Sequence, residues 1–137
     1  MALQLTNNRV LICKWFLERF GGKYRSMMPD YRALGVHEND VMLGGVIFDC
    51  FYGSDCEVSI AIADKRCMQR RFIRQGFDYP FVQLGLKRIS ATVAQSNQRS
   101  LELMFRLGFK LEGRKRQARE DGDELLFGML RQECRWI

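Results

Sequence analysis

Three stretches of the chain carry apolar residues at the spacing of β-strands. In residues 56–63 aliphatic side chains occupy every second position, and small or polar residues lie between them. Residues 89–93 repeat this alternation. Because neighbouring side chains of a strand point to opposite faces, each stretch is predicted to be a strand with one face in a core. The third stretch, Val41–Tyr52, is rich in branched and aromatic residues, and its Gly44-Gly45 pair indicates a bulge or a close backbone approach.

Three other stretches have the apolar spacing of helices, and glycines mark where they end. They are residues 9–20, with Asn7 or Asn8 as the cap and Gly21-Gly22 as the end; residues 67–84, ended by Gly85; and a stretch from Ser96 or Asn97 to Gly108. The side chains expected to face inward are Val10, Ile12 or Cys13, Phe16, Leu17 and Phe20 in the first helix, and Leu101, Met104 or Phe105, and Leu107 in the third. Pro80 lies inside the second helix, where proline costs about 3 kcal/mol. Its ring would press on the carbonyl of Gly76, so we expect a bend there.

Shorter signals complete the order of elements. Residues 33–37 and 125–130 are predicted to be strands, residues 38–40, 53–55 and 121–122 to be turns, residues 23–32 to be a loop, and the C-terminal tail to form one helical turn. The basic stretch 110–119 is expected to form a solvated hairpin with the last strand. The resulting order is α–β–β–β–α–β–α–β–β, with one strand–helix–strand crossover. It predicts one domain over residues 1–137, of the α/β or α+β class, in which helices cover both faces of a mixed sheet.

Composition indicates the number of domains and the cellular compartment, but it does not indicate a reaction. The 137 residues are enough for one domain with a real core. Five cysteines without ligand spacing, and a single histidine, His37, predict free thiols in a reducing compartment and no metal site. No signal peptide or membrane-length apolar run is visible, so we expect a cytoplasmic protein without a membrane partner. A net charge of +6 is compatible with nucleic acid, a nucleotide or an acidic protein as partner.

Two helix starts are candidates for ligand binding. Arginines cluster where the helix after residue 63 begins, and the amide groups of a helix start attract phosphate. An ordinary solvated basic face explains the same arginines equally well. At the second start, Asn97 and Ser100 can contact a ligand, although capping alone accounts for both residues and is favoured by the residues themselves.

The second helix start lies in a longer motif. Asn97, Ser100, Leu103, Met104, Arg106, Leu107, Gly108 and Phe109 resemble the second conserved block of the GNAT superfamily of acyl-CoA-dependent N-acyltransferases, and residues 81–89 resemble its flank. Residues 112–123 are similar to the branch that acetylates N-termini of ribosomal proteins. The chain also resembles small GNAT-type proteins of tailed bacteriophages, which implies a host cytoplasm. The resemblance implies the GNAT fold, a mostly antiparallel mixed sheet with a central splayed pair of parallel strands.

The resemblance also implies a reaction. Acetyl-CoA would be the co-substrate, and an amine would attack its thioester directly. The acceptor would be an amine-bearing small molecule, a protein N-terminus or a lysine. Glu57 would be the general base, because it begins the key strand on the polar face. The implied cofactor contacts are the backbone of Ser59, Ile60, Ala61 and Ile62 for pantetheine, the residues Arg66, Cys67, Met68, Gln69, Arg70 and Arg71 for the pyrophosphate, and Asn97 and Ser100 beside them.

Two departures from the family pattern keep other functions open. The pyrophosphate loop has none of the glycines that the family places there, and Met104 occupies the position where many of these enzymes have a tyrosine acid. A GNAT-fold protein without turnover, serving as a binding or structural component of a phage, is therefore the alternative. A third reading is a protein that modifies or binds nucleic acid, which only the charge favours. A homodimer is left open.

Overall fold

A computed structural model describes residues 2–20 and 30–137 of the chain. The predicted stop at Gly21-Gly22 and most of the predicted loop 23–32 lie outside the described residues, as does the side chain of Phe20. The strands are β1 (Gln4–Thr6), β2 (Arg32–Glu38), β3 (Val41–Tyr52), β4 (Asp55–Ile62), β5 (Arg88–Ala94), β6 (Lys110–Arg119) and β7 (Gly122–Leu130). The helices are α1 (Arg9–Phe20), α2 (Arg70–Asp78) and α3 (Gln98–Leu107), with short helical turns at Lys65–Cys67, Tyr79–Gln83 and Arg131–Glu133.

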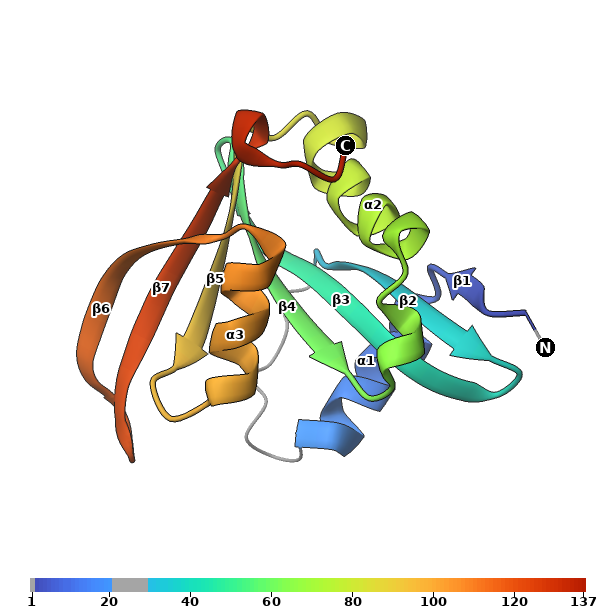
Figure 1. Cartoon of the computed structure of the whole chain (residues 1–137), viewed down its shortest axis with the longest axis horizontal. Coiled ribbons are helices and arrows are strands. Elements are labelled where there is room, and N and C mark those ends of the chain that lie inside the picture. The colour runs from blue at the N-terminus through green and yellow to red at the C-terminus, as the bar shows by residue number, and fades with distance from the viewer. Residues whose placement is uncertain (1, 21–29) are drawn as a thin grey trace.

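The seven strands form one mixed sheet in the order β1-β2-β3-β4-β5-β7-β6. Every neighbouring pair is antiparallel except β4 and β5, which are parallel. These two strands are in register only at Glu57 and Ser90. Figure 1 shows them close together at their first residues and far apart at their arrowheads. The predicted fold class, including the splayed parallel pair, is therefore confirmed.

Helices cover both faces of the sheet, as the sequence predicts. On one face Ile12 and Phe16 of α1 pack with Ile47 and Ala61 of the strands. On the other face Phe77 of α2, together with Met104 and Leu107 of α3, packs over β4, β5 and β7. In Figure 1, α2 and α3 lie in front of the sheet and α1 lies behind it. The sheet thus separates two compartments, here named the α1 face and the α2–α3 face.

The first helix begins where the sequence predicts, because Asn8 caps it. The side chain of Asn8 accepts a hydrogen bond from the N–H of Leu11 at 3.1 Å. The inward face is narrower than predicted: Ile12 and Phe16 are buried, whereas Val10 is 69% and Leu17 is 43% exposed. A helix that lies on one face of a sheet buries only the stripe that faces the strands, so the two outer apolar positions remain in solvent.

The predicted helix 67–84 is divided into three pieces. A 3₁₀ turn occupies Lys65–Cys67, α2 follows, and a π-helical turn occupies Tyr79–Gln83. Pro80 has no N–H to donate to the carbonyl four residues earlier, and the turn widens so that the N–H of Leu84 reaches the carbonyl of Tyr79. The helix geometry changes at Tyr79, three residues after Gly76, and the bend expected at Gly76 itself stays a prediction. Gly85 ends the segment with φ +68°.

Two features of the sheet differ from the sequence prediction. Strand β1 pairs with β2 and was not predicted, since three residues carry no readable period. A bulge that the sequence does not predict lies at Cys50, with φ +51°, and shifts the register between Asp49 and Tyr52. The predicted irregularity at Gly44 is present too: Gly44 pairs with Val36, but His37 pairs with Met42, so the register shifts beside this glycine. Gly44 also makes the predicted close approach, because a Cβ atom there would lie 2.5 Å from Sγ of Cys67. Among residues 2–20 and 30–137, no helix is long and apolar enough to cross a membrane.

The glycine at position 128 makes room for an ion pair across β5 and β6. A Cβ atom at Gly128 would collide with the guanidinium of Arg88 and the carboxylate of Glu112, which bind each other at 2.6 Å. We expect Gly128→Ala to lower the free energy of unfolding by about 1–2 kcal/mol, because the ion pair must separate. Urea denaturation measures this change. Gly113→Ala on β6 is the control, since its Cβ meets only an ordinary contact at 3.5 Å. Equal midpoints for the two variants would contradict the expectation.

Candidate functional site

The splayed strands leave one edge of β4 open. Beyond Glu57 the strand keeps its antiparallel pairing with β3, through Ser59–Ile47 to Ile62–Gly44, but has no registered partner in β5. The backbone groups of a central strand that point away from its remaining neighbour are left for another partner. An extended chain with amide groups can pair with such an edge. Residues 59–62, predicted to hold pantetheine, are the ones at this edge.

The closed end of the gap is held by a polar network. The hydroxyl of Ser90 donates to the carboxylate of Asp55 at 2.8 Å, and Arg88 donates to the oxygen of Ser90 at 3.1 Å. Arg88 also binds Glu112 at 2.6 Å and lies 3.5 Å from Asp55, and these two carboxylates raise the pKa of the Arg88 guanidinium. The network ties β4, β5 and β6 together where the parallel strands touch, so the gap opens in one direction only.

The amide groups available to a phosphate are fewer than the sequence predicts. The N–H of Arg66 donates to Asp64, that of Cys67 donates to the carbonyl of Asp64, and that of Met68 donates to the carbonyl of Lys65. The 3₁₀ turn thus uses three of the predicted donors internally. At the start of α2 the described residues offer no acceptor to the N–H groups of Gln69, Arg70 and Arg71, and no side chain caps the helix. These three amides are free to bind an anion.

The arginine side chains divide in the same way. Arg66 binds Glu38 at 3.2 Å and Asp64 at 3.0 Å, so two carboxylates compensate its charge and raise its pKa. Arg70 lies over the ring of Trp136, 5.6 Å from its centroid, and Arg71 donates to Gln69. Within the described part of the chain, neither Arg70 nor Arg71 pairs with a carboxylate. Both guanidinium groups keep their charge for a ligand.

Two of the cysteines near the site are chemically silent. Burial raises the pKa of the Cys67 thiol, and its Sγ contacts the carbonyl of Leu43. Burial, with Asp55 beside it, raises the pKa of Cys56 to about 12. Thiols held protonated are poor nucleophiles, which argues against a covalent acyl-cysteine at these two positions. All five cysteines are free, as predicted. Because the N–H of Cys67 already donates to Asp64, neither this amide nor the thiol supports the predicted phosphate contact of Cys67.

The start of α3 lies at the open end of the gap. Asn97 caps this helix by accepting from the N–H of Ser100 at 3.2 Å, so the capping interpretation is confirmed. Figure 1 shows α3 beginning beside the arrowhead of β5, at the end of the gap where β4 and β5 lie far apart. Asn97 is exposed and Ser100 is half-buried, which leaves both accessible at the mouth of the gap. Their contact with a cofactor stays a prediction.

A group of acidic side chains occupies the α1 face at the closed end. Glu57 is opposite Asp49 on β3, and carboxylate oxygens of both residues lie within 4.8 Å of each other and of Sγ of Cys50. Asp49 is only 7% exposed. Sequence reasoning identified Glu57 but missed Asp49, because their contact depends on the register across the β3 bulge. Two adjacent carboxylates can accept a proton from a cation or hold that cation by charge.

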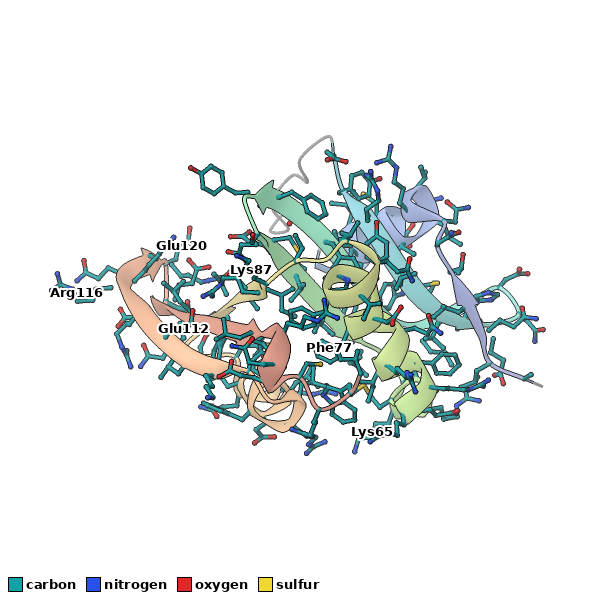
Figure 2. All side chains as sticks on the ribbon, turned by 90° about the horizontal axis from the view of Figure 1, so that it is seen from above. Lys65, Phe77, Lys87, Glu112, Arg116 and Glu120 are labelled. Carbon is teal, nitrogen blue, oxygen red and sulfur yellow. The ribbon has the colours of Figure 1, made fainter. Side chains whose placement is uncertain are left out.

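An apolar cavity lies on the other face, between α2 and the sheet. Its volume is about 90 Å³. Its floor is the row Leu34, Val46 and Ile60, and Ile73 and Gly76 of α2 lie above it. The end nearest β5 is lined by Ile89, Leu107 and Phe109. Figure 2 shows Phe77, which also lines the cavity, between α2 and the C-terminal segment, where its ring stacks on Trp136.

The structure supplies no tyrosine acid where the family pattern has one. Met104 is 3% exposed and packs in the core, so its side chain takes no part in proton transfer. Tyr79 packs on Phe48, with ring centroids 5.2 Å apart, on the face opposite Glu57. Tyr52 is 87% exposed at a hairpin. None of the three combines with Glu57 into an acid–base pair.

The basic strand β6 is largely paired with acidic residues. Arg114 binds Asp123 at 2.8 Å, and Arg119 binds Glu124 at 3.3 Å. The backbone N–H of Gln117, and then Arg114, lower the pKa of the Asp123 carboxyl. Arg116 extends from the far tip of the β6–β7 hairpin, away from the gap (Figure 2). Charge compensation along this strand weakens the nucleic-acid interpretation, because binding to a polyanion requires uncompensated cations.

Comparison with solved structures identifies the architecture. A point mutant of SpeG, a spermidine N-acetyltransferase from Vibrio cholerae, matches with a TM-score of 0.74 at 18% identity, over 95% of this chain and 94% of the other. A SpeG chimera with hSSAT matches with a TM-score of 0.71 at 19% identity, over 96% and 98%. The dodecameric form of the Vibrio cholerae enzyme matches with a TM-score of 0.72 at 19% identity, over 95% and 94%. No protein-family model and no curated protein matches the sequence.

The sequence identity between this chain and each of these structures is below 20%, so the comparison shows a shared fold and not a shared substrate. The matches extend over nearly the whole of both chains, so the likeness covers the strand gap and the helices that flank it. The chain therefore has the GNAT fold, which it shares with these spermidine N-acetyltransferases.

Proposed function

We propose that this protein is an acyl-CoA-dependent N-acyltransferase that acts on a primary amine. The observation that carries the proposal is the unpaired edge of β4 at residues 59–62, beside free amides at the start of α2. Acyl-CoA has matching parts in the same order: a diphosphate and a pantetheine arm with two amide groups. A binding site for acyl-CoA needs an unpaired strand edge for the pantetheine arm and, next to it, free amides for the diphosphate.

The start of α2 would hold the diphosphate. The N–H groups of residues 69–71 would donate to its oxygens, and Arg70 and Arg71 would add charge-assisted hydrogen bonds. This combination replaces the glycines that the family pattern has in the loop. The pantetheine arm would then pair with residues 59–62, and Asn97 and Ser100 would contact it from the start of α3. The thioester would lie near the closed end, beside Glu57.

The carboxylates on the α1 face would provide the base. An alkyl amine has a pKa near 10.4 and arrives as an ammonium ion at neutral pH. Glu57, supported by the charge of Asp49, would remove its proton. The amine nitrogen would then attack the thioester carbon, the C–N bond would form, the C–S bond would break, and CoA would leave as a thiolate. The thiolate would take the second proton of the nitrogen, so that the products are the amide and free CoA thiol. A thiol has a pKa near 8.5, so departure requires no acid from the protein.

The acceptor is expected to be a small cationic amine. Asp49, Asp55 and Glu57 place negative charge on one face of a protein whose net charge is +6. Spermidine is the first acceptor to test, because it is the substrate in the names of the solved structures that share the fold. A protein N-terminus, as in the ribosomal branch, is the competing acceptor. That branch, a phage origin and a cytoplasmic location stay predictions from the sequence.

Acetyl-CoA is expected to stabilise the folded protein. At a hundredfold excess over its dissociation constant a ligand adds about 2.7 kcal/mol, which raises the Tm of a domain of this size by about 8–12 °C. Differential scanning fluorimetry with acetyl-CoA, and with adenosine diphosphate as the control ligand, measures the shift. An unchanged Tm at millimolar acetyl-CoA would contradict the proposal.

The second candidate is a GNAT-fold protein that does not turn over. Two observations favour it: the internal use of the amides at residues 66–68, and Met104 at the family's acid position. The two candidates differ in a simple assay. Release of free CoA thiol in the presence of spermidine or an α-amine peptide supports the enzyme. A thermal shift with acetyl-CoA but no thiol release with any amine supports the silent protein.

A further inference from the structure

The sheet is incompletely covered beneath α2. Leu34, Val46 and Ile60 are neighbours in register on β2, β3 and β4, and all three face the helix. Each is only half-buried, whereas Phe48 and Val58, next to them on the same face, are buried. Interiors are normally packed as densely as organic crystals. A row of half-buried aliphatic side chains under a helix therefore indicates room for an apolar group that does not belong to the protein.

Gly76 keeps that space open. It lies on the inward side of α2, four residues after Phe72 and three after Ile73, and it lines the cavity. No atom outside its own helix segment lies within 4 Å of where its Cβ would be. Glycine inside a helix is less favourable than alanine, and neither φ nor crowding requires it here. The helix is thus less stable than it would be with a larger residue at position 76, and the position is one where a side chain would fill the cavity.

The cavity reaches the strand gap. Ile60 forms part of its floor and belongs to the stretch of β4 that β5 does not pair with. Ile89 of β5 and Leu107 of α3 line the cavity from the other side of the gap. The acidic group of Glu57 and Asp49 lies on the opposite, α1 face. A thioester in the gap would meet an amine from one face and an apolar cavity on the other.

We infer that the acyl donor carries a chain longer than acetyl and that this cavity binds its tail. The inference rests on the proposed function, because the thioester must lie in the gap. An apolar cavity of about 150 Å³ admits benzene, so 90 Å³ scales to roughly three or four carbons. The donor is therefore a short straight-chain acyl-CoA of about four to six carbons in the acyl group.

The chemistry of transfer is unchanged by the longer chain. The C–S bond of the thioester breaks, the C–N bond to the amine forms, one proton of the ammonium passes to the carboxylates, and a second passes from the nitrogen to the CoA thiolate. The tail leaves the cavity with the amide product. Its burial contributes to donor binding and selects the donor by length.

The test compares binding of donors that differ only in length. Isothermal titration calorimetry measures Kd for CoA, acetyl-CoA, butyryl-CoA, hexanoyl-CoA and decanoyl-CoA. Each buried methylene is worth about fourfold in affinity, so butyryl-CoA should bind about 15-fold more tightly than acetyl-CoA. The gain should stop near six carbons. Gly76→Leu should reduce the butyryl-to-acetyl affinity ratio to about one, because leucine fills the cavity.

Two further variants separate cavity filling from damage to the fold. Gln75→Leu adds the same side chain to the exposed side of α2 and should keep the wild-type ratio. Val46→Phe fills the cavity from the side of the sheet. Like Gly76→Leu, it should reduce the butyryl-to-acetyl affinity ratio to about one. Melting temperatures show which variants are folded.

The outcomes distinguish the two proposals. If CoA binds but affinity does not depend on chain length, or Gly76→Leu keeps the dependence, the tail site is wrong and the acyltransferase stands. If neither CoA nor any acyl-CoA binds, both proposals fail together. Tight binding of butyryl-CoA or hexanoyl-CoA that Gly76→Leu abolishes supports both.

Discussion

Replacement of Glu57 by glutamine is expected to lower kcat by about 10²–10⁴-fold at pH 7, the range of a general base. Glutamine keeps the shape of the side chain but cannot accept a proton. The loss should shrink as the pH rises toward the pKa of the amine, near 10, because solvent then supplies the neutral nucleophile. The measurement is the pH dependence of kcat from release of free CoA, with spermidine and an α-amine peptide as acceptors.

The control for Glu57→Gln makes the same change away from the site. Glu120 lies at the tip of the β6–β7 hairpin (Figure 2), so Glu120→Gln should leave kcat within twofold. Asp49→Asn tests the neighbouring charge and should raise KM for a cationic acceptor more than it lowers kcat. A rate for Glu57→Gln equal to the wild-type rate at pH 7 would remove this residue from the mechanism.

Loss of Arg70 and Arg71 together is expected to weaken acyl-CoA binding about 10²-fold or more. Each guanidinium would contribute a charge-assisted hydrogen bond to phosphate, worth about 1.5–3 kcal/mol. The free amides of residues 69–71 remain in the double alanine variant, so binding should weaken without vanishing. Titration calorimetry at two salt concentrations gives the change, and the salt dependence of Kd should also become shallower.

Arg74→Ala is the matched control for the double variant. Arg74 lies one turn further along α2 and is exposed, so its removal changes the net charge without touching the helix start. We expect at most a twofold change in Kd. Equal losses for Arg74→Ala and the double variant would mean that only net charge matters, and the assignment of the diphosphate to the start of α2 would be wrong.

The sequence predicted most elements because their signals are local. The alternation in β4 and β5, the cap at Asn97 and the stops at Gly85 and Gly108 each depend on residues within a few positions of one another. A period of two or an αL glycine has the same meaning wherever the strand or helix is placed. The family motif at residues 97–109 then indicated how the elements assemble.

The candidate site was predicted only in outline. Arg66 was assigned to phosphate, yet it binds Glu38, which is 28 positions earlier in the chain. Amides at residues 66–68 were counted as donors, but a 3₁₀ turn uses them. Asp49 was missed beside Glu57. The contact of Arg66 with Glu38 and that of Asp49 with Glu57 depend on which strand lies next to which, and no local pattern contains that information. The 3₁₀ turn is local, since Asp64 and Lys65 accept its bonds, but a turn of three residues has no readable period.

The sequence by itself determined where strands and helices form and which face of each is apolar, because backbone preferences and side-chain alternation act over short separations. Only the tertiary structure decided that β4 and β5 touch at one pair of residues, that two carboxylates meet across a bulge, and that Gly76 leaves a cavity open above the sheet. These features arise from register and packing between distant segments, where one residue of shift would exchange the two faces of a strand.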